Sequence, residues 1–321
     1  MSSIIFPSKK NNYLRKSLSG WVQTLSDELT ECGCFRTARA YRTTLNSFLN
    51  FCGKKDLFPD EITEKLIVTY ERSLKERKLS LNTISFYMRN LRAICNKGNK
   101  QKLFNLPTQN MFSRVYTKVA VSRKRALTKQ EMKGLENLLA DPILPKEEKD
   151  TLRLFMFAFH ARGMSFVDLA YLKKSDINLK GNTFSYFRRK TGQFIEVSLN
   201  RTLRQMIHYF MENNSSSPFL FPIIRDHTQQ TYMQYCTGLR MQNQRLKQVA
   251  VRARLGKGLS THQARHAWAT IAKNENIPVW VISEGLGHTS VATTYIYLDS
   301  FGTSVLDQAH RKVSQAISKV C

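Results

Sequence analysis

The chain has 321 residues, with 50 Lys and Arg against 24 Asp and Glu, so its formal net charge is +26. A charge of this size favours a polyanionic partner, either nucleic acid or an anionic membrane surface. No apolar run reaches the roughly 18 residues that a membrane span needs, and the polar start lacks the apolar core of a signal peptide. We therefore expect a nucleic-acid partner and no membrane.

The six cysteines include no Cys-x-x-Cys pair and no zinc-type spacing with histidine, which is typical of reduced cysteines in a cytosolic protein. The acidic residues form no cluster suited to magnesium or calcium. We expect a cytoplasmic protein whose chemistry uses no metal and no cofactor.

The length allows two domains. Residues 1–14 are polar and basic and are expected to be flexible. Over residues 15–102, apolar side chains recur at three-and-four spacing, as in Trp21, Leu25 and Leu29, which predicts a helical domain. Within it we expect one helix to open at Asp60 and another to be capped by Asn82.

Basic side chains recur on these predicted helices. They are candidate DNA contacts, although a merely solvated charged face is an equally good interpretation. The candidates are Arg36, Arg39, Arg42, Arg89 and Arg92.

Residues 103–126 lose the helical periodicity, contain Pro107 and end in Arg123, Lys124 and Arg125 with no acidic residue. This pattern predicts a basic linker between domains. It could be a flexible tether or a strap along a phosphate backbone.

Residues 127–303 predict a second domain that is mostly helical with one β-hairpin. Thr128 and Glu131 form a capping box, and Ser165 with Asp168 starts a short helix. Residues 183–188 and 194–199 are rich in β-branched and aromatic residues and predict a hairpin with Lys190 at its tip. Asn200 and Thr261 begin further helices. The predicted fold class is mainly α with a small β-hairpin or sheet.

Several polar residues of this second domain could together act on a phosphodiester. Attack by a tyrosine needs cations for the non-bridging oxygens, a base for the phenol and an acid for the leaving oxygen. His262 and Arg265 lie three apart at a helix start, where an anion is favoured. His288 follows a turn containing Gly285 and Gly287, although alone it would be an ordinary turn residue. The set is Arg162, Lys190, His262, Arg265, His288 and Tyr297.

The order of these motifs resembles the catalytic domain of the tyrosine recombinase (phage integrase) family. The motifs are Lys190 in the hairpin, His262-Gln-Ala-Arg265, Leu286-Gly-His288, and Tyr297 after Thr293-Thr294. The helical region resembles the family's core-binding domain. The resemblance implies that Tyr297 forms a 3′-phosphotyrosine and that Arg265 and His288 hold the phosphate. It further implies that Lys190 protonates the 5′-oxygen and that His262 activates the tyrosine or organises the site. It also implies that no metal or nucleotide cofactor is needed.

One position departs from the family's pattern. The family's first arginine stands three residues before an acidic residue, and that position is Ser165, which suits a helix N-cap. We assign the missing guanidinium to Arg162, beside Gly163. Tyr295 is a competing nucleophile; it lies roughly 200° from Tyr297 around a helix, so only one of the two can face the phosphate, and we expect Tyr295 to pack in the core.

The resemblance also implies how the protein assembles. Residues 304–321 carry an apolar face and would be an exchange helix that links four copies on paired sites in double-stranded DNA, or would dock on their own domain. We expect a nucleoid-associated, site-specific recombinase acting in DNA inversion, resolution or mobile-element integration. The short N-terminus favours an invertase or resolvase.

Two alternatives remain. A DNA-binding regulator on a catalytically impaired recombinase scaffold would explain Ser165. A topoisomerase-like enzyme would share the chemistry without paired sites.

Overall fold

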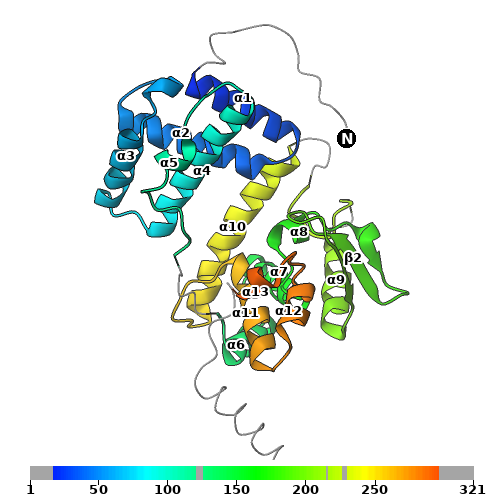
Figure 1. Cartoon of the computed structure of the whole chain (residues 1–321). Helices are drawn as coiled ribbons and strands as arrows, with labels where there is room; N and C mark the ends of the chain where they lie inside the picture. The colour runs from blue at the N-terminus through cyan, green and yellow to red at the C-terminus, as the bar shows by residue number, and fades with distance from the viewer. Residues whose placement is uncertain (1–16, 121–125, 215, 226–229, 296–321) are drawn as a thin grey trace, which may run out of the picture. The chain divides into compact units, whose positions relative to one another are not determined.

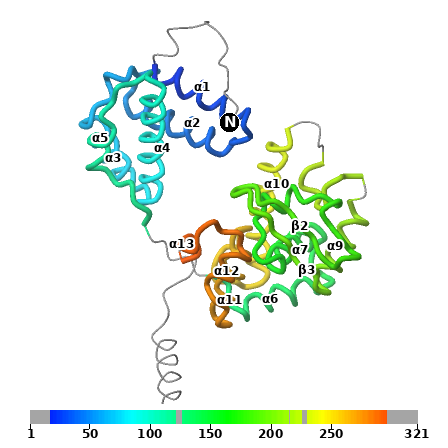
Figure 2. The backbone as a smooth tube through the Cα atoms, turned by 45° about the vertical axis from the view of Figure 1, so that its right-hand side comes forward, coloured from blue at the N-terminus to red at the C-terminus, as the bar shows by residue number. Residues whose placement is uncertain are grey.

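The computed structural model describes residues 17–120, 126–214, 216–225 and 230–295. The chain divides into two compact units between Arg123 and Lys124, and each unit is described by itself (Figures 1 and 2). Tyr297, the basic residues 123–125 and the predicted exchange helix 304–321 lie outside the described residues.

The first unit is helical. Its elements are α1 (Leu18–Glu31), α2 (Phe35–Cys52), a 3-10 helix (Pro59–Glu61), α3 (Glu64–Glu76), α4 (Leu81–Lys100) and α5 (Thr108–Met111). Trp21, Phe48 and Tyr70 are buried at its centre, and the indole Nε1 of Trp21 donates to the Ile94 carbonyl at 3.1 Å. The predicted amphipathic helices therefore bury their apolar faces against one another.

Two predicted helix starts are wrong. Asp60 lies in the 3-10 helix, and α3 begins after Thr63, whose side chain accepts from the Leu66 amide. Helix α4 is capped by Ser80, while the Asn82 side-chain amide exchanges two hydrogen bonds of 2.9 Å with the backbone of Ala120. Asn82 thus fastens a distant segment, a role that local sequence does not reveal.

The segment expected to be a linker from residue 103 packs largely on the first unit. Phe104, Met111, Phe112 and Val115 are buried in its core, and the Tyr116 amide donates to Glu71 Oε1 at 2.8 Å. Apolar side chains in an irregular segment are buried without a helical period, so periodicity could not detect them.

The second unit is mainly α with a small antiparallel sheet, as predicted (Figure 1). Helix α7 (Lys146–His160) is largely buried and packs against several of its neighbours. The other elements are α6 (Lys129–Ala140), α8 (Phe166–Ala170), a 3-10 helix (Lys174–Asp176), β1 (Ile177–Asn178), β2 (Thr183–Phe187), β3 (Phe194–Ser198), α9 (Arg201–Asn213), α10 (Thr231–Arg252), α11 (Thr261–Asn274), α12 (Val279–Gly285) and α13 (Val291–Tyr295).

The sheet has the strand order β1-β2-β3, and β2 pairs with β3 so that Phe187 lies opposite Phe194. Phe184, Tyr186, Ile195 and Val197 are buried on the inner face. The predicted hairpin is therefore confirmed, and alternation along β2 decides which side chains turn toward the core.

Three predicted caps are also confirmed. Thr128 and Glu131 form a reciprocal capping box, Ser165 accepts from the Asp168 amide, and Asn200 accepts from the Leu203 amide. Within the described ranges, the helices are too short or too polar to cross a membrane.

Candidate active site

Arg265 lies at the centre of the candidate site. It lies in the second turn of α11, is 3% exposed, and its Nη1 donates to the Gly163 carbonyl at 2.9 Å. Its Nη2 donates to the Leu286 carbonyl. One guanidinium thus joins the turn after α7 to the loop after α12, and these bonds fix its direction.

Arg188 is the second buried guanidinium. It is 6% exposed, and its Nη1 donates to the carbonyl of Gly287, the residue that follows Arg265's acceptor. Its Nε is buried without a hydrogen-bond partner among the described residues. A buried donor left unpaired is costly, so this nitrogen suits a ligand oxygen.

The hairpin tip that carries Lys190 is held in place by Asp168. This carboxylate is 3% exposed; its Oδ2 accepts from the Ser165 hydroxyl at 2.6 Å and its Oδ1 accepts from the Arg189 amide at 2.8 Å. Ser165 therefore has a second task besides its cap, because it orients the carboxylate that fixes the tip. Lys190 itself is exposed.

His288 lies beside these cations. Its ring is 8% exposed, and its Nδ1 is hydrogen-bonded to Thr294 Oγ1 at 2.8 Å. Desolvation, followed by the positive charges of Arg265, Arg188 and Lys190, lowers the pKa of His288 to about 4. The imidazole is therefore neutral at pH 7, which lets one ring nitrogen donate a hydrogen bond without adding a fourth positive charge.

Two glycines allow these residues to approach. Gly287 has φ +64, and a Cβ there would lie 2.6 Å from Ile195 Cδ1 and 3.1 Å from Arg188 Cδ. Gly163 has φ +69, and its Cβ would lie 3.0 Å from the Arg265 Cα. Both positions need a left-handed backbone and have no space for a side chain.

The structure does not bring every predicted residue to this point. Arg162 has φ +55 and lines a separate cavity of about 780 Å³ together with Trp268 and Glu284. Its positive charge acts on the buried Tyr186 hydroxyl, as do the charges of Arg265 and Arg188. His262 is exposed at the start of α11, with its ring edge-on to His266 at 4.6 Å between centroids.

Tyr295 is 59% exposed at the end of α13. The expectation that it packs in the core is wrong, because the buried residue of this short helix is Thr294, which holds His288. Exposure leaves the Tyr295 hydroxyl chemically accessible.

The candidate DNA contacts of the first unit lie on α2 and α4. Arg36, Arg39, Arg42 and Arg89 are exposed, and Arg92 is partly buried. Arg42 Nη2 forms an ion pair with Asp27 at 3.3 Å, which leaves it less available to phosphate.

The sequence places Arg188 at the end of a predicted strand and not among the candidate site residues. A signal was present: Phe184, Tyr186 and Arg188 occupy alternate positions, so an arginine falls on the inner face two residues before the predicted Lys190. A charged residue at an inward position needs a partner or a ligand.

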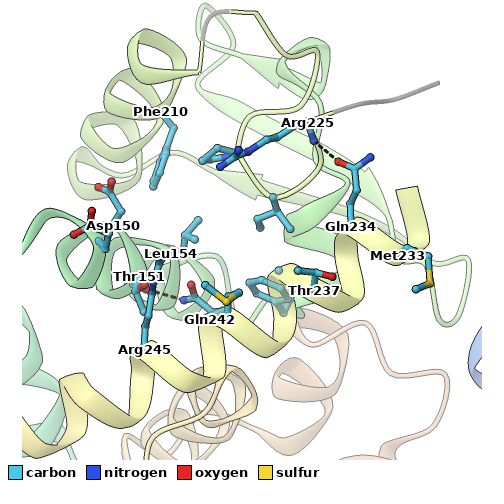
Figure 3. Close-up of a pocket in the computed structure, with 16 residues that line it drawn as sticks. Asp150, Thr151, Leu154, Phe210, Arg225, Met233, Gln234, Thr237, Gln242 and Arg245 are labelled. Carbon is cyan, nitrogen blue, oxygen red and sulfur yellow. Dashed lines mark hydrogen bonds between the residues drawn. The ribbon is translucent and has the colours of Figure 1, made fainter. Parts of the chain in front are cut away.

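A cavity of about 760 Å³ lies between α7, α9 and α10 (Figure 3). Gln242 crosses to α7 and donates to the Thr151 carbonyl at 2.8 Å, while Gln234 accepts from the Arg225 amide. None of the predicted catalytic residues that the structure describes lines this cavity. The cavity is therefore distinct from the candidate site.

Two guanidiniums, a lysine and a neutral imidazole close to one loop of the second unit are groups suited to binding a phosphate ester. The Phage integrase family model matches residues 125–303, and the Phage integrase SAM-like domain model matches residues 17–111. The chain belongs to the phage integrase family.

Known tyrosine recombinases resemble the chain in sequence. The chain is 28% identical over 181 residues to tyrosine recombinase XerA of Pyrococcus furiosus, covering 56% of this chain and 59% of that protein. It is 24% identical over 293 residues to tyrosine recombinase XerC of Roseiflexus castenholzii, covering 88% of each. The chain thus spans somewhat over half of the first relative and most of the second.

Solved structures share the fold. The Tn1549 transposon integrase in complex with transposon right end DNA has a TM-score of 0.63 at 15% identity, covering 93% of this chain and 99% of that one. The lambda integrase dimer bound to a COC′ core site has a TM-score of 0.63 at 16% identity, covering 89% and 96%.

Proposed function

We propose that this protein is a tyrosine-type site-specific recombinase, an enzyme that breaks and rejoins double-stranded DNA through a 3′-phosphotyrosine. The observation that carries the proposal is the gathering of Arg188, Arg265 and His288 on one loop, with Lys190 close enough to act on the pKa of His288. The matched relatives' names support the same activity.

The chemistry follows from the charges. A tyrosine oxygen attacks the scissile phosphorus, the P–O5′ bond breaks, and the tyrosine–phosphate bond replaces it, so no energy source is consumed. The two guanidiniums stabilise the charge that grows on the non-bridging oxygens. His288 is neutral and donates one hydrogen bond to the same phosphate.

Lys190 protonates the leaving 5′-oxygen. It lies on a tip tied to Asp168 and to the Gly287 loop, so its position is set independently of the substrate. Tyr297 is the nucleophile because of its place in the motif order. His262, at the start of α11, accepts the phenol proton or orders the site.

Arg188 takes the role that the sequence assigned to Arg162. Arg188 shares an acceptor loop with Arg265, has an unpaired buried nitrogen among the described residues and acts on His288, whereas Arg162 lines a different cavity. This geometry argues against a decayed site, since a second guanidinium is present despite Ser165.

The partner is double-stranded DNA, contacted through Arg36, Arg39, Arg89 and Arg92 and through the basic residues 123–125. We also infer a homotetramer on paired sites, linked by residues 304–321. A lambda integrase tetramer bound to a Holliday junction is among the structures that share this fold. A DNA substrate would place the protein with the nucleoid in the cytoplasm.

Recombination between two sites on one plasmid tests the proposal. The sites would be chosen by selecting duplexes that the full chain binds from a random-sequence library. We expect inversion or deletion with the wild type and none with Arg265→Ala. Tight, selective binding without strand exchange or any covalent intermediate would favour the regulator, and relaxation of supercoils without exchange would favour the topoisomerase-like enzyme.

A further inference from the structure

Two phenylalanines stand on the outer face of the hairpin, next to its tip. Phe187 is 69% exposed and Phe194 is 54% exposed; they face each other across β2 and β3 with ring centroids 5.3 Å apart. The next outward pair, Ser185 and Glu196, is polar. The aromatic pair is thus an isolated apolar point on a polar face.

The hairpin does not depend on this pair for its position. The Arg188 amide donates to the Gln193 carbonyl at 2.8 Å, the Arg189 amide donates to Asp168, and the Arg188 side chain donates to Gly287. Aromatic cross-strand pairs stabilise sheets modestly, and here the tip is already fixed at three points. Stabilising the hairpin is therefore not a sufficient reason for exposing two rings.

The rings border a hollow rather than a filled core. Phe187, Phe194 and Arg189 line a cavity of about 270 Å³ together with Tyr171, and the Arg189 guanidinium lies over the Tyr171 ring at 3.8 Å. Aromatic faces and a stacked guanidinium around an open hollow are suited to contact with nucleobases.

The position of the pair relative to Lys190 indicates which molecule it meets. Phe187 is three residues from Lys190, so their Cα atoms are at most about 10 Å apart even if the chain between them is fully extended. DNA rises about 3.4 Å per base pair, so a phosphate held at Lys190 brings roughly three base steps within reach of the rings.

We propose that Phe187 and Phe194 form an apolar wedge that opens a base step of the duplex within about three base pairs of the cleaved phosphate. The proposal rests on the DNA-cleaving function proposed above and adds a sequence preference to it. Steps that unstack easily, such as TA and CA, are favoured beside the cut because opening them costs least.

The test compares the double variant Phe187→Thr/Phe194→Thr with the control Thr183→Ser/Ser198→Thr. The double variant keeps a β-branched residue at both positions, and the control exchanges Thr and Ser in an outward pair of the same strands farther from the tip. Each full-length protein is bound to the selected duplex with 2-aminopurine placed, in turn, at the positions within three base pairs of the cleaved phosphate. Circular dichroism melting checks that the variants fold.

With the wild type and the control, we expect fluorescence to rise at one step, because an unstacked 2-aminopurine is less quenched. The Phe double variant loses this rise and forms the covalent adduct about fivefold more slowly or worse, since stacking of one aromatic ring on one base contributes at least that much. The salt dependence of its DNA affinity stays unchanged, because phosphate contacts are untouched.

A double variant with undiminished fluorescence and cleavage would overturn the wedge. Loss of self-association in DNA-free sedimentation, with fluorescence and cleavage intact, would overturn it in favour of a protein interface. Failure of the wild type to form any adduct would instead refute the proposed function, so the two failures are distinguishable.

Discussion

Acidification should destabilise this protein through His288. The imidazole is buried beside three cations, and its pKa is lowered to about 4 in the folded chain. In the unfolded chain the ring returns to its ordinary value of 6.5. As the pH falls below 6.5, the His288 ring binds a proton in the unfolded chain but stays neutral in the folded chain. The free energy of unfolding therefore decreases.

The size of the effect follows from the two pKa values. Between pH 7 and pH 5 the loss is about 2 kcal/mol, and below pH 4 it levels off near 3 kcal/mol. Above pH 6.5 the neutral His288 ring contributes its full share to the free energy of unfolding. Burial also lowers the pKa of His160, which acts in the same direction, so a comparison of variants is needed to isolate His288.

Urea unfolding of the wild type and of His288→Asn at pH 7 and pH 5 measures this contribution. Asn can keep a polar contact with Thr294 but does not titrate. We expect the wild type to lose about 2 kcal/mol more than the variant between the two pH values. His208→Gln, which alters an exposed histidine of α9, serves as the control and should behave like the wild type. Equal losses in wild type and His288→Asn would refute the reasoning.

Three further predictions follow from the site and the first unit. Gly287→Ala and Gly192→Ala both place alanine at a left-handed φ, but a Cβ at position 192 meets open space while one at position 287 meets Ile195 and Arg188. Gly287→Ala should therefore lower the free energy of unfolding in urea by roughly 1–3 kcal/mol more than Gly192→Ala does. Equal losses would contradict the packing described for Gly287. Arg188→Ala should slow adduct formation about 100-fold or more while Arg162→Ala slows it less, measured by gel under single-turnover conditions; the reverse order would restore the role to Arg162. Arg36→Ala should reduce the salt slope of DNA binding by about 1, and Arg42→Ala by less because of its ion pair with Asp27; an unchanged slope for Arg36→Ala would remove it from the DNA surface.

Local signals in the sequence predicted much of the fold. The capping box at Thr128, the side-chain cap at Ser165 and the hairpin depend on neighbouring residues, and they appear where expected. Asn82 was assigned to the wrong contact because its partner, Ala120, is 38 residues away. Contacts between distant segments depend on packing that no local pattern records.

In the candidate site, too, the sequence predicted residues from local motifs but not the contacts between distant segments. Residue types and their order pointed to Arg265 and His288, but the bond from Arg265 to Gly163 spans 102 residues. The proposed preference for Arg188 over Arg162 rests on such contacts. Strand alternation places Arg188 on the inner face, whereas the left-handed φ of +55 at Arg162 is not one that its residue type demands.

The most direct test of the account is the identity of the residue that becomes joined to DNA. Wild type, Tyr297→Phe and Tyr295→Phe would each be incubated with a nicked duplex carrying the selected site, which traps the cleaved strand. Peptide mass spectrometry would then locate the nucleotide. We predict a 3′-phosphotyrosine at Tyr297 in the wild type and in Tyr295→Phe, and no adduct with Tyr297→Phe. An adduct that persists in Tyr297→Phe would contradict the assignment of the nucleophile, and the absence of an adduct from all three would contradict the enzyme itself.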